Sequence, residues 1–275
     1  MTEFCHICPT AFLDEFAVDR PHHLTLAHLV EKDPKYVEFY KNAGGINIMD
    51  NSAFEMYKEG REMFSAGKLV PLAESIGADY IVMTDYPGEA GIKTIEKAKE
   101  MAPMIKECGF GTFFVPQSAV GDKADLIEGF KWALKDPLID YIGVSILAIP
   151  NAYGVESGNK LQRFLSRWMF MKELEDLGLT EDMFSKKIHF LGMVDGPNEI
   201  TLMKDAGFLK YIDTWDSSAA TWAGLNGISF DHSPSGLMAG KYENPVDFDF
   251  PMSDNLNIQL AKENCEYIDK LLREF

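Results

Sequence analysis

Arginine is scarce in this sequence, and positive charge in general is outnumbered. The 275 residues include 26 Lys+Arg, of which five are arginine, against 43 Asp+Glu, so the net charge is −17 and the pI about 4.7. A protein with this balance repels polyanions at long range. The composition therefore excludes a general nucleic-acid coat protein, and any contact with nucleic acid must come from a local patch.

Cysteine and long apolar runs are also scarce. The chain has four cysteines, and its start, MTEFCHICP, lacks the basic segment and long apolar run of a secretory signal. No stretch approaches the ~20 apolar residues of a membrane span. We therefore expect a reduced, cytoplasmic protein with no membrane partner.

One cysteine pair has metal-site spacing. Cys5 and Cys8 form a Cys-x-x-Cys motif, and His22 or His23 could supply a second half-site. The alternative is that Phe4–Cys8 is a buried strand with small side chains. We favour the strand and predict no metal and no cofactor, while metal binding by Cys5 and Cys8 stays open at this point.

Strand-like and helix-like segments alternate about eight times along the chain. No linker, low-complexity segment or repeat divides it, which predicts one domain over residues 1–275. This alternation predicts a parallel sheet, and we expect a (β/α)8 TIM barrel that ends in a helix over about 254–275, with Asp254 as N-cap. The expected strands are Phe4–Cys8, Ile46–Met49, Tyr80–Met83, Thr112–Val115, Tyr141–Val144, Ile188–Gly192, Tyr211–Ile212 and Ile228–Phe230.

Polar residues follow several of these strands. Asp50, Asp85, Gln117 and Ser145 each come just after an apolar run, and Asp216 lies in the segment DTWDSS. In a parallel barrel the carboxyl ends of the strands meet at one face, which carries the chemistry. The sequence therefore predicts a polar site at the mouth of the barrel.

Two interpretations of the clustered carboxylates are open. They could hold a divalent metal, which needs several oxygens around one point. They could instead act as a nucleophile and an acid/base, as in glycosyl transfer. Together with Gln117 and Phe54, they suit a flat, hydrogen-bonding ligand such as a purine.

Six short motifs in this chain resemble those of the tRNA-guanine transglycosylase superfamily. They occur in the family's order, each near a predicted strand end, and the similarity runs from about residue 20 to about 249. The motifs are DNSAFE at 50–55, VMTDYP at 82–87, VPQSA at 115–119, SILA at 145–148, FLGMVDGP at 190–197 and TWDSSAATWAGLNG at 214–227.

The resemblance implies a barrel that replaces guanine in a polynucleotide by a 7-deazaguanine base. Asp216 matches the nucleophile that attacks the sugar, and Asp50 matches the acid/base. Asp85 and Gln117 match the pair that recognises the base, which must leave its stack to enter the site. The other matched positions are Ser145, Ile146 and Leu147, whose backbone contacts the base, and Phe54 and Leu191, which enclose its ring.

The chain departs from the tRNA enzymes at two features. Trp222 and Leu225 stand where the family has arginines that hold tRNA phosphates, and the family's C-terminal zinc motif is missing. These differences make the chain more similar to phage-type DNA-guanine transglycosylases, which would act in the host cytoplasm. We therefore predict exchange of guanine in DNA for a 7-deazaguanine through a covalent Asp–sugar intermediate.

Other functions stay open at this point. They are exchange on tRNA, a non-catalytic base-binding subunit of such an enzyme, and a metal-dependent barrel hydrolase. Assembly into a homo-oligomer is also left open.

One group of cations could contact nucleic-acid phosphates. Lys160, Arg163 and Arg167 follow i, i+3, i+7 spacing, so they share one face of a predicted helix. The alternative is an ordinary solvated helix face.

Overall fold

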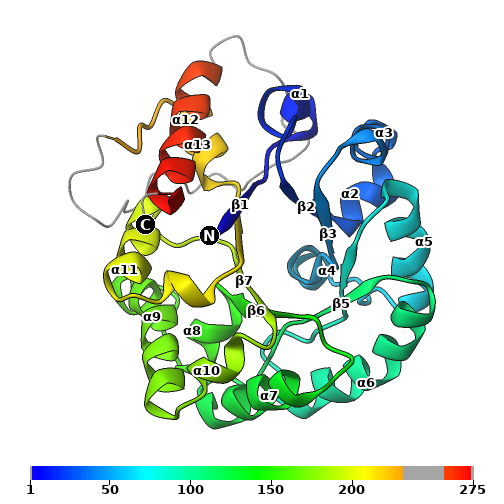
Figure 1. Ribbon diagram of the computed structural model, residues 1–275, viewed down its shortest axis with the longest axis vertical. Coiled ribbons are helices and arrows are strands. Elements are labelled where there is room, and N and C mark those ends of the chain that lie inside the picture. The colour runs from blue at the N-terminus through cyan, green and yellow to red at the C-terminus, as the bar shows by residue number, and fades with distance from the viewer. Residues whose placement is uncertain (1, 232–256, 274–275) are drawn as a thin grey trace.

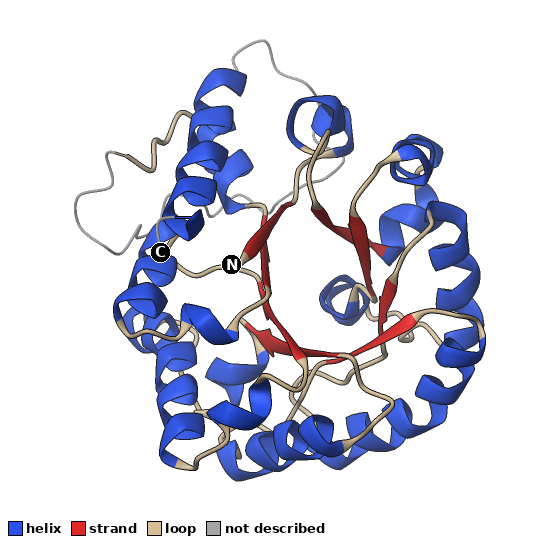
Figure 2. Ribbon diagram, viewed as in Figure 1, coloured by secondary structure: helices blue, strands red, loops and turns tan. Residues whose placement is uncertain are grey.

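The computed structural model describes residues 2–231 and 257–273, and its centre is a ring of eight parallel strands (Figures 1 and 2). The strands pair in the order β1-β8-β7-β6-β5-β4-β3-β2, so each strand from β2 to β8 lies beside its neighbours in sequence. This topology confirms the predicted (β/α)8 TIM barrel. The strands are β1 (Glu3–His6), β2 (His22–Leu26), β3 (Ile46–Asp50), β4 (Tyr80–Val82), β5 (Gly111–Phe114), β6 (Tyr141–Ser145), β7 (Lys187–Leu191) and β8 (Thr214–Ser217).

Most helices surround this ring on the outside, whereas α4 lies within the outline of the ring in this view (Figures 1 and 2). Their apolar faces pack on the strands; α6, for example, buries Ala98, Met101 and Ile105 on one side. No helix in the described ranges is long and apolar enough to cross a membrane. The α-helices are α1 (Leu13–Phe16), α2 (Ala27–Lys32), α3 (Pro34–Asn42), α4 (Ala53–Glu59), α5 (Ala66–Ile76), α6 (Gly91–Glu107), α7 (Lys123–Lys135), α8 (Ala148–Ala152), α9 (Lys160–Asp176), α10 (Thr180–Met183), α11 (Pro197–Asp205), α12 (Ala219–Leu225) and α13 (Ile258–Arg273), with 3-10 turns η1 (Thr10–Phe12) and η2 (Leu209–Tyr211).

The strands form because their residues are buried on both faces. All five residues of β6, Tyr141–Ser145, are buried, as are the three central residues of β3 and β7. Burial on both faces is typical of parallel sheets covered by helices. Aromatic side chains also fill the interior of the barrel: the ring of Phe113 stacks on that of Tyr141, with 5.3 Å between their centroids.

Two strand predictions were wrong, and one strand was missed. The missed strand is His22–Leu26, because its two histidines interrupt the apolar pattern. His23 is buried there, and its ring is hydrogen-bonded to the Gly44 carbonyl at 2.9 Å. The predicted strand Tyr211–Ile212 belongs to a 3-10 turn and its end, and β8 begins at Thr214. The segment Ile228–Phe230 contains no strand.

The ring has a seam between its first two strands. Within the described residues, β1 forms its ladder with β8 and β2 forms its ladder with β3, and none joins β1 to β2. Asp269 of α13 closes this seam from outside, because its carboxylate accepts from Arg20 at 2.5 Å and bonds to His6 at 2.8 Å. The predicted N-cap of this helix, Asp254, lies outside the described residues, and the described helix begins at Ile258.

Candidate active site

A cavity of about 550 Å³ opens at the carboxyl ends of the strands. Its wall combines residues from the ends of β3, β5, β6, β7 and β8 and from the start of α9. The structure thus brings together nearly all of the site residues predicted from sequence. Those that line the cavity are Asp50, Phe54, Asp85, Gln117, Ser145, Ile146, Leu147, Lys160, Arg163, Leu191 and Asp216.

Asp85 and Gln117 form a buried pair on this wall. Asp85 is 4% exposed; its Oδ1 accepts from the Asn51 amide at 2.8 Å and its Oδ2 accepts from the Gln117 amide. Burial raises the pKa of Asp85 to about 6, although these two hydrogen bonds oppose the shift. The Gln117 Oε1 is buried without a hydrogen-bond partner among the described residues, so it can accept from a ligand.

Asp50 is half-buried at the end of β3, beside a strained residue. Its Oδ2 accepts from the backbone N–H of Ser52 at 2.8 Å, and Ser52 adopts a left-handed conformation with φ 57°. Burial raises the pKa of Asp50 well above its usual range, and the nearby charges of Glu55, Asp85 and Asp216 add to the shift. These surroundings favour the neutral carboxyl form more than those of an exposed aspartate do.

One oxygen of Asp216 is held by two neighbouring groups. It is part of β8 itself, with its Oδ1 accepting the backbone N–H of Gly192 at 3.0 Å and lying 2.9 Å from the Nε2 of His189. His189 is fully buried on β7 and was not predicted as a site residue. The signal in the sequence was a single histidine inside the apolar run IHFL.

Ser145 shapes the wall that follows β6. Its Oγ accepts the backbone N–H of Leu147 at 3.1 Å and of Ala148 at 3.3 Å, which turns the chain from the strand into α8. The Ile146 N–H donates to the Leu191 carbonyl at 3.0 Å and so ties this turn to the end of β7. Phe54 lies across the cavity and is 51% exposed at its rim.

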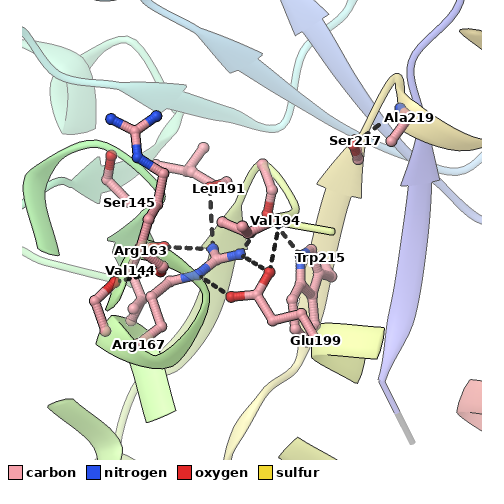
Figure 3. Close-up of polar contacts among 12 residues, drawn as sticks. Val144, Ser145, Arg163, Arg167, Leu191, Val194, Glu199, Trp215, Ser217 and Ala219 are labelled. Atoms are coloured by element: carbon pink, nitrogen blue, oxygen red, sulfur yellow. Dashed lines mark hydrogen bonds and ion pairs between the residues drawn. The ribbon is translucent and has the colours of Figure 1, made fainter. Parts of the chain in front are cut away.

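The predicted nucleic-acid contact at Arg167 is wrong. Arg167 is 0% exposed, and its guanidinium forms two hydrogen bonds to Glu199, at 2.8 and 2.6 Å. It also donates to the carbonyls of Val144, Leu191 and Gly192, so no donor is left for a phosphate (Figure 3). Spacing alone placed it on the exposed helix face, whereas α9 packs this position against the loop after β7.

Lys160 and Arg163, the other two members of the predicted stripe, line the cavity. In Figure 3 the Arg163 guanidinium points away from the Arg167 cluster, on the side of Ser145. Their contact with nucleic acid stays a prediction.

Cys5 and Cys8 are buried as the strand interpretation requires. Burial raises the pKa of both thiols. Within residues 2–231 and 257–273, no group of three or more His, Cys, Asp or Glu side chains is arranged to hold a metal ion.

The chain resembles solved structures, whereas its sequence matches no family model and no curated protein. A solved structure that it resembles is the HpcH/HpaI aldolase from Desulfitobacterium hafniense DCB-2, with 10% sequence identity and a TM-score of 0.46. The alignment covers 80% of this chain and 86% of the aldolase.

This finding corrects the function predicted from the motifs. The named structure is an aldolase, and nothing in the comparisons points to a transglycosylase, to 7-deazaguanine or to a phage protein, so guanine exchange by a glycosyltransferase is withdrawn. Membership of the transglycosylase superfamily stays a prediction from the motifs.

Proposed function

We propose that this chain is an enzyme that performs acid–base chemistry on a small, flat molecule rich in N–H donors. The observation that carries the proposal is a pair of carboxyl groups, Asp50 and Asp216, that line one cavity in unlike surroundings. Burial raises the pKa of Asp50, whereas the Oδ1 of Asp216 is within hydrogen-bond distance of the Gly192 N–H and the His189 ring. Two carboxyl groups whose pKa values are set apart by their environments commonly serve as the acid and the base of one active site.

The hydrogen-bonding groups of the cavity favour a ligand with several N–H donors. Asp85 and the unpaired Oε1 of Gln117 are acceptors, and both are almost fully buried. Apolar side chains of Leu147, Leu191 and Phe54 form the neighbouring wall. An amino-substituted ring would satisfy the acceptors with its edge and cover the apolar wall with its face.

A second feature favours a ligand that also carries an anionic group. Lys160 and Arg163 line the same cavity, and no carboxylate of the described residues pairs with either of them. The Arg163 Nε is buried and has no hydrogen-bond partner there. Because arginine binds phosphate and carboxylate through paired donors, these two side chains suit such a group.

The two carboxyl groups can divide the chemistry between them. Asp50 donates its proton to the substrate atom that gains electron density, and Asp216 accepts a proton from the substrate or from a water molecule that attacks it. The hydrogen bonds on Oδ1 of Asp216 leave its Oδ2 as the oxygen for this transfer. Proton transfer of this kind typically contributes about 10²–10⁴ to a rate.

Calorimetric titration with six compounds tests the ligand class. They are the 5′-monophosphates of guanosine, adenosine and uridine and the three free nucleosides. We expect guanosine compounds to bind tightest, because their base offers three N–H donors on one edge. Arg163→Ala should weaken the monophosphates about tenfold, since one charged hydrogen bond is worth roughly 1.5 kcal/mol, and should leave the nucleosides unchanged.

Lys172→Ala is the matched control, because Lys172 lies on the exposed side of the same helix in pairs with Glu175 and Asp176. Equal weakening of both compound classes by Arg163→Ala would contradict the anionic subsite.

Mass spectrometry of the bound compounds then tests the reaction. We expect wild-type protein to convert a bound compound, and Asp50→Asn and Asp216→Asn to bind it without conversion. Binding without conversion by the wild type across all compounds would make the chain a binding protein and overturn its assignment as an enzyme.

A further inference from the structure

Asp216 is the end of a chain of hydrogen-bonding groups inside the barrel. The Nε2 of His189 lies 2.9 Å from Asp216 Oδ1, and its Nδ1 lies 2.6 Å from the Oγ1 of Thr214. The Thr214 hydroxyl in turn is hydrogen-bonded to Tyr141. The three residues come from the neighbouring strands β7, β8 and β6, with His189 and Thr214 opposite each other in the ladder.

The number of protons in this chain decides its direction. An ionised Asp216 can only accept, so the Nε2 of His189 must carry its proton, and the Nδ1 of a neutral ring must then accept from Thr214. The single hydroxyl proton of Thr214 is used in this bond, so its oxygen accepts from the Tyr141 hydroxyl. Every proton then points toward Asp216.

The opposite direction would send the protons toward Tyr141. It requires Asp216 to donate to His189, His189 to donate to Thr214, and Thr214 to donate to the Tyr141 oxygen. The Asp216 Oδ1 that would make the first donation already accepts the Gly192 N–H. The hydroxyl proton of Tyr141 would then have to go to a group other than Thr214. Burial also raises the pKa of Tyr141, which opposes loss of that proton as phenolate.

We propose that Tyr141, Thr214 and His189 are positioning residues that fix the orientation of the Asp216 carboxyl group. The chain fixes the ring of His189 in the Nε2–H form and, with the Gly192 N–H, occupies Oδ1 of Asp216. The Oδ2 oxygen is thereby left to the cavity. The other groups around Asp216 are Cys5, opposite it in the β1–β8 ladder, and the carboxyl group of Asp50; neither competes for Oδ1.

The ring of His189 gives a direct test that needs no ligand. In protein labelled with ¹⁵N-histidine, long-range ¹⁵N–¹H spectra distinguish the Nε2–H form from the Nδ1–H form. We expect wild-type His189 to be in the Nε2–H form at neutral pH. Thr214→Val keeps the shape of the side chain and removes the hydroxyl, so the Nδ1 resonance should lose the shift caused by its hydrogen bond, and the Nε2 proton should exchange with water about tenfold faster.

Two comparisons make the result specific. Thr25→Val removes another fully buried hydroxyl, one that donates to Asn47, and should leave the His189 resonances in place. Tyr141→Phe removes the first donor of the chain and should change them less than Thr214→Val does. A wild-type ring in the Nδ1–H form, or identical His189 spectra in Thr214→Val and wild type, would overturn the proposal. Because the spectra report on the free protein, they are independent of whether the acid–base reaction proposed above takes place.

Discussion

Replacement of Arg167 with methionine is expected to lower the free energy of unfolding by about 3–5 kcal/mol. The Arg167 and Glu199 side chains are 1% and 0% exposed, so water cannot replace the lost partner. Removing one member of such a pair leaves the other as an uncompensated buried charge, which is the source of the large cost.

Arg167 also binds the backbone at the end of β7, which forms part of the cavity wall. It donates to the carbonyls of Leu191 and Gly192, and its guanidinium lies over the rings of Phe190 and Trp215, 4.8 and 5.2 Å from their centroids. Gly192 is the residue whose N–H binds Asp216. The Arg167→Met variant should therefore lose order in the loop after β7 as well as stability.

Urea unfolding followed by circular dichroism measures the stability change. The matched control is Arg61→Met, because Arg61 pairs with Glu31 at the surface with 34% of its side chain exposed. Exposed pairs contribute about 0–1 kcal/mol, so this variant should unfold close to the wild-type midpoint. If both variants lost the same free energy of unfolding, the buried pair would contribute no more to stability than the exposed one.

A double variant separates the charge from the backbone contacts. Arg167→Met with Glu199→Leu removes both charges and should recover part of the lost stability. Recovery should stay incomplete, because the Val144 and Leu191 carbonyls lose the donor that Arg167 supplied. If Arg167→Met does not fold, Arg167→Lys, which keeps the charge and loses the paired donors, should show a smaller loss in the same assay.

The second large effect is a dependence of stability on pH at Asp85. Its pKa is about 6 in the folded protein and ~3.9 in an unfolded chain. The folded state therefore holds this proton more tightly, so its contribution to stability is present in full below pH ~4 and is lost as pH rises through about 6. At pH 8, ionisation of Asp85 should cost about 3 kcal/mol relative to a neutral residue at the same place.

Asp85→Asn tests this dependence, because asparagine stays neutral at every pH. The Gln117 amide can rotate so that its Oε1 accepts from the new Asn amide. Its NH2 group then takes the buried position that Oε1 held, and the cost of this change is the same at every pH, so the test is the slope of stability with pH. The stability of the variant relative to wild type should grow by about 1–1.5 kcal/mol between pH 5 and pH 8. Chemical unfolding at several pH values measures this difference.

Asp182→Asn, at an exposed position, controls for the general effect of removing one negative charge from an acidic protein. A stability difference between Asp85→Asn and wild type that is constant with pH, or that shrinks as pH rises, would show that the pKa of Asp85 is not raised.

The barrel and most of its cavity could be predicted from the sequence because both follow from local patterns. An apolar run followed by one polar residue, as at Asp50 and Asp85, marks a strand end, and all strand ends of a parallel barrel share a face. The strand His22–Leu26 broke this pattern, because its histidines are accommodated by partners that are distant in sequence.

The remaining site residues depend on contacts between distant segments. Arg167 and Glu199 are 32 residues apart, and helical spacing gives no sign that the first is buried against the second. His189 lies 27 residues from Asp216 and faces it because β7 and β8 are neighbours. The reaction was the hardest feature to predict from the sequence, because the same carboxylates suit several chemistries and the six short motifs did not decide among them.

The seam between β1 and β2 also has a consequence for synthesis on the ribosome. The strand partner of Glu3 is Thr214, so the first strand made must wait for the last before its ladder can form. At about 5–20 residues per second, this wait is roughly 10–40 s, and Asp269, which ties His6 to Arg20, is made later still. During translation β1 therefore remains without its strand partner on the nascent chain until β8 has been made.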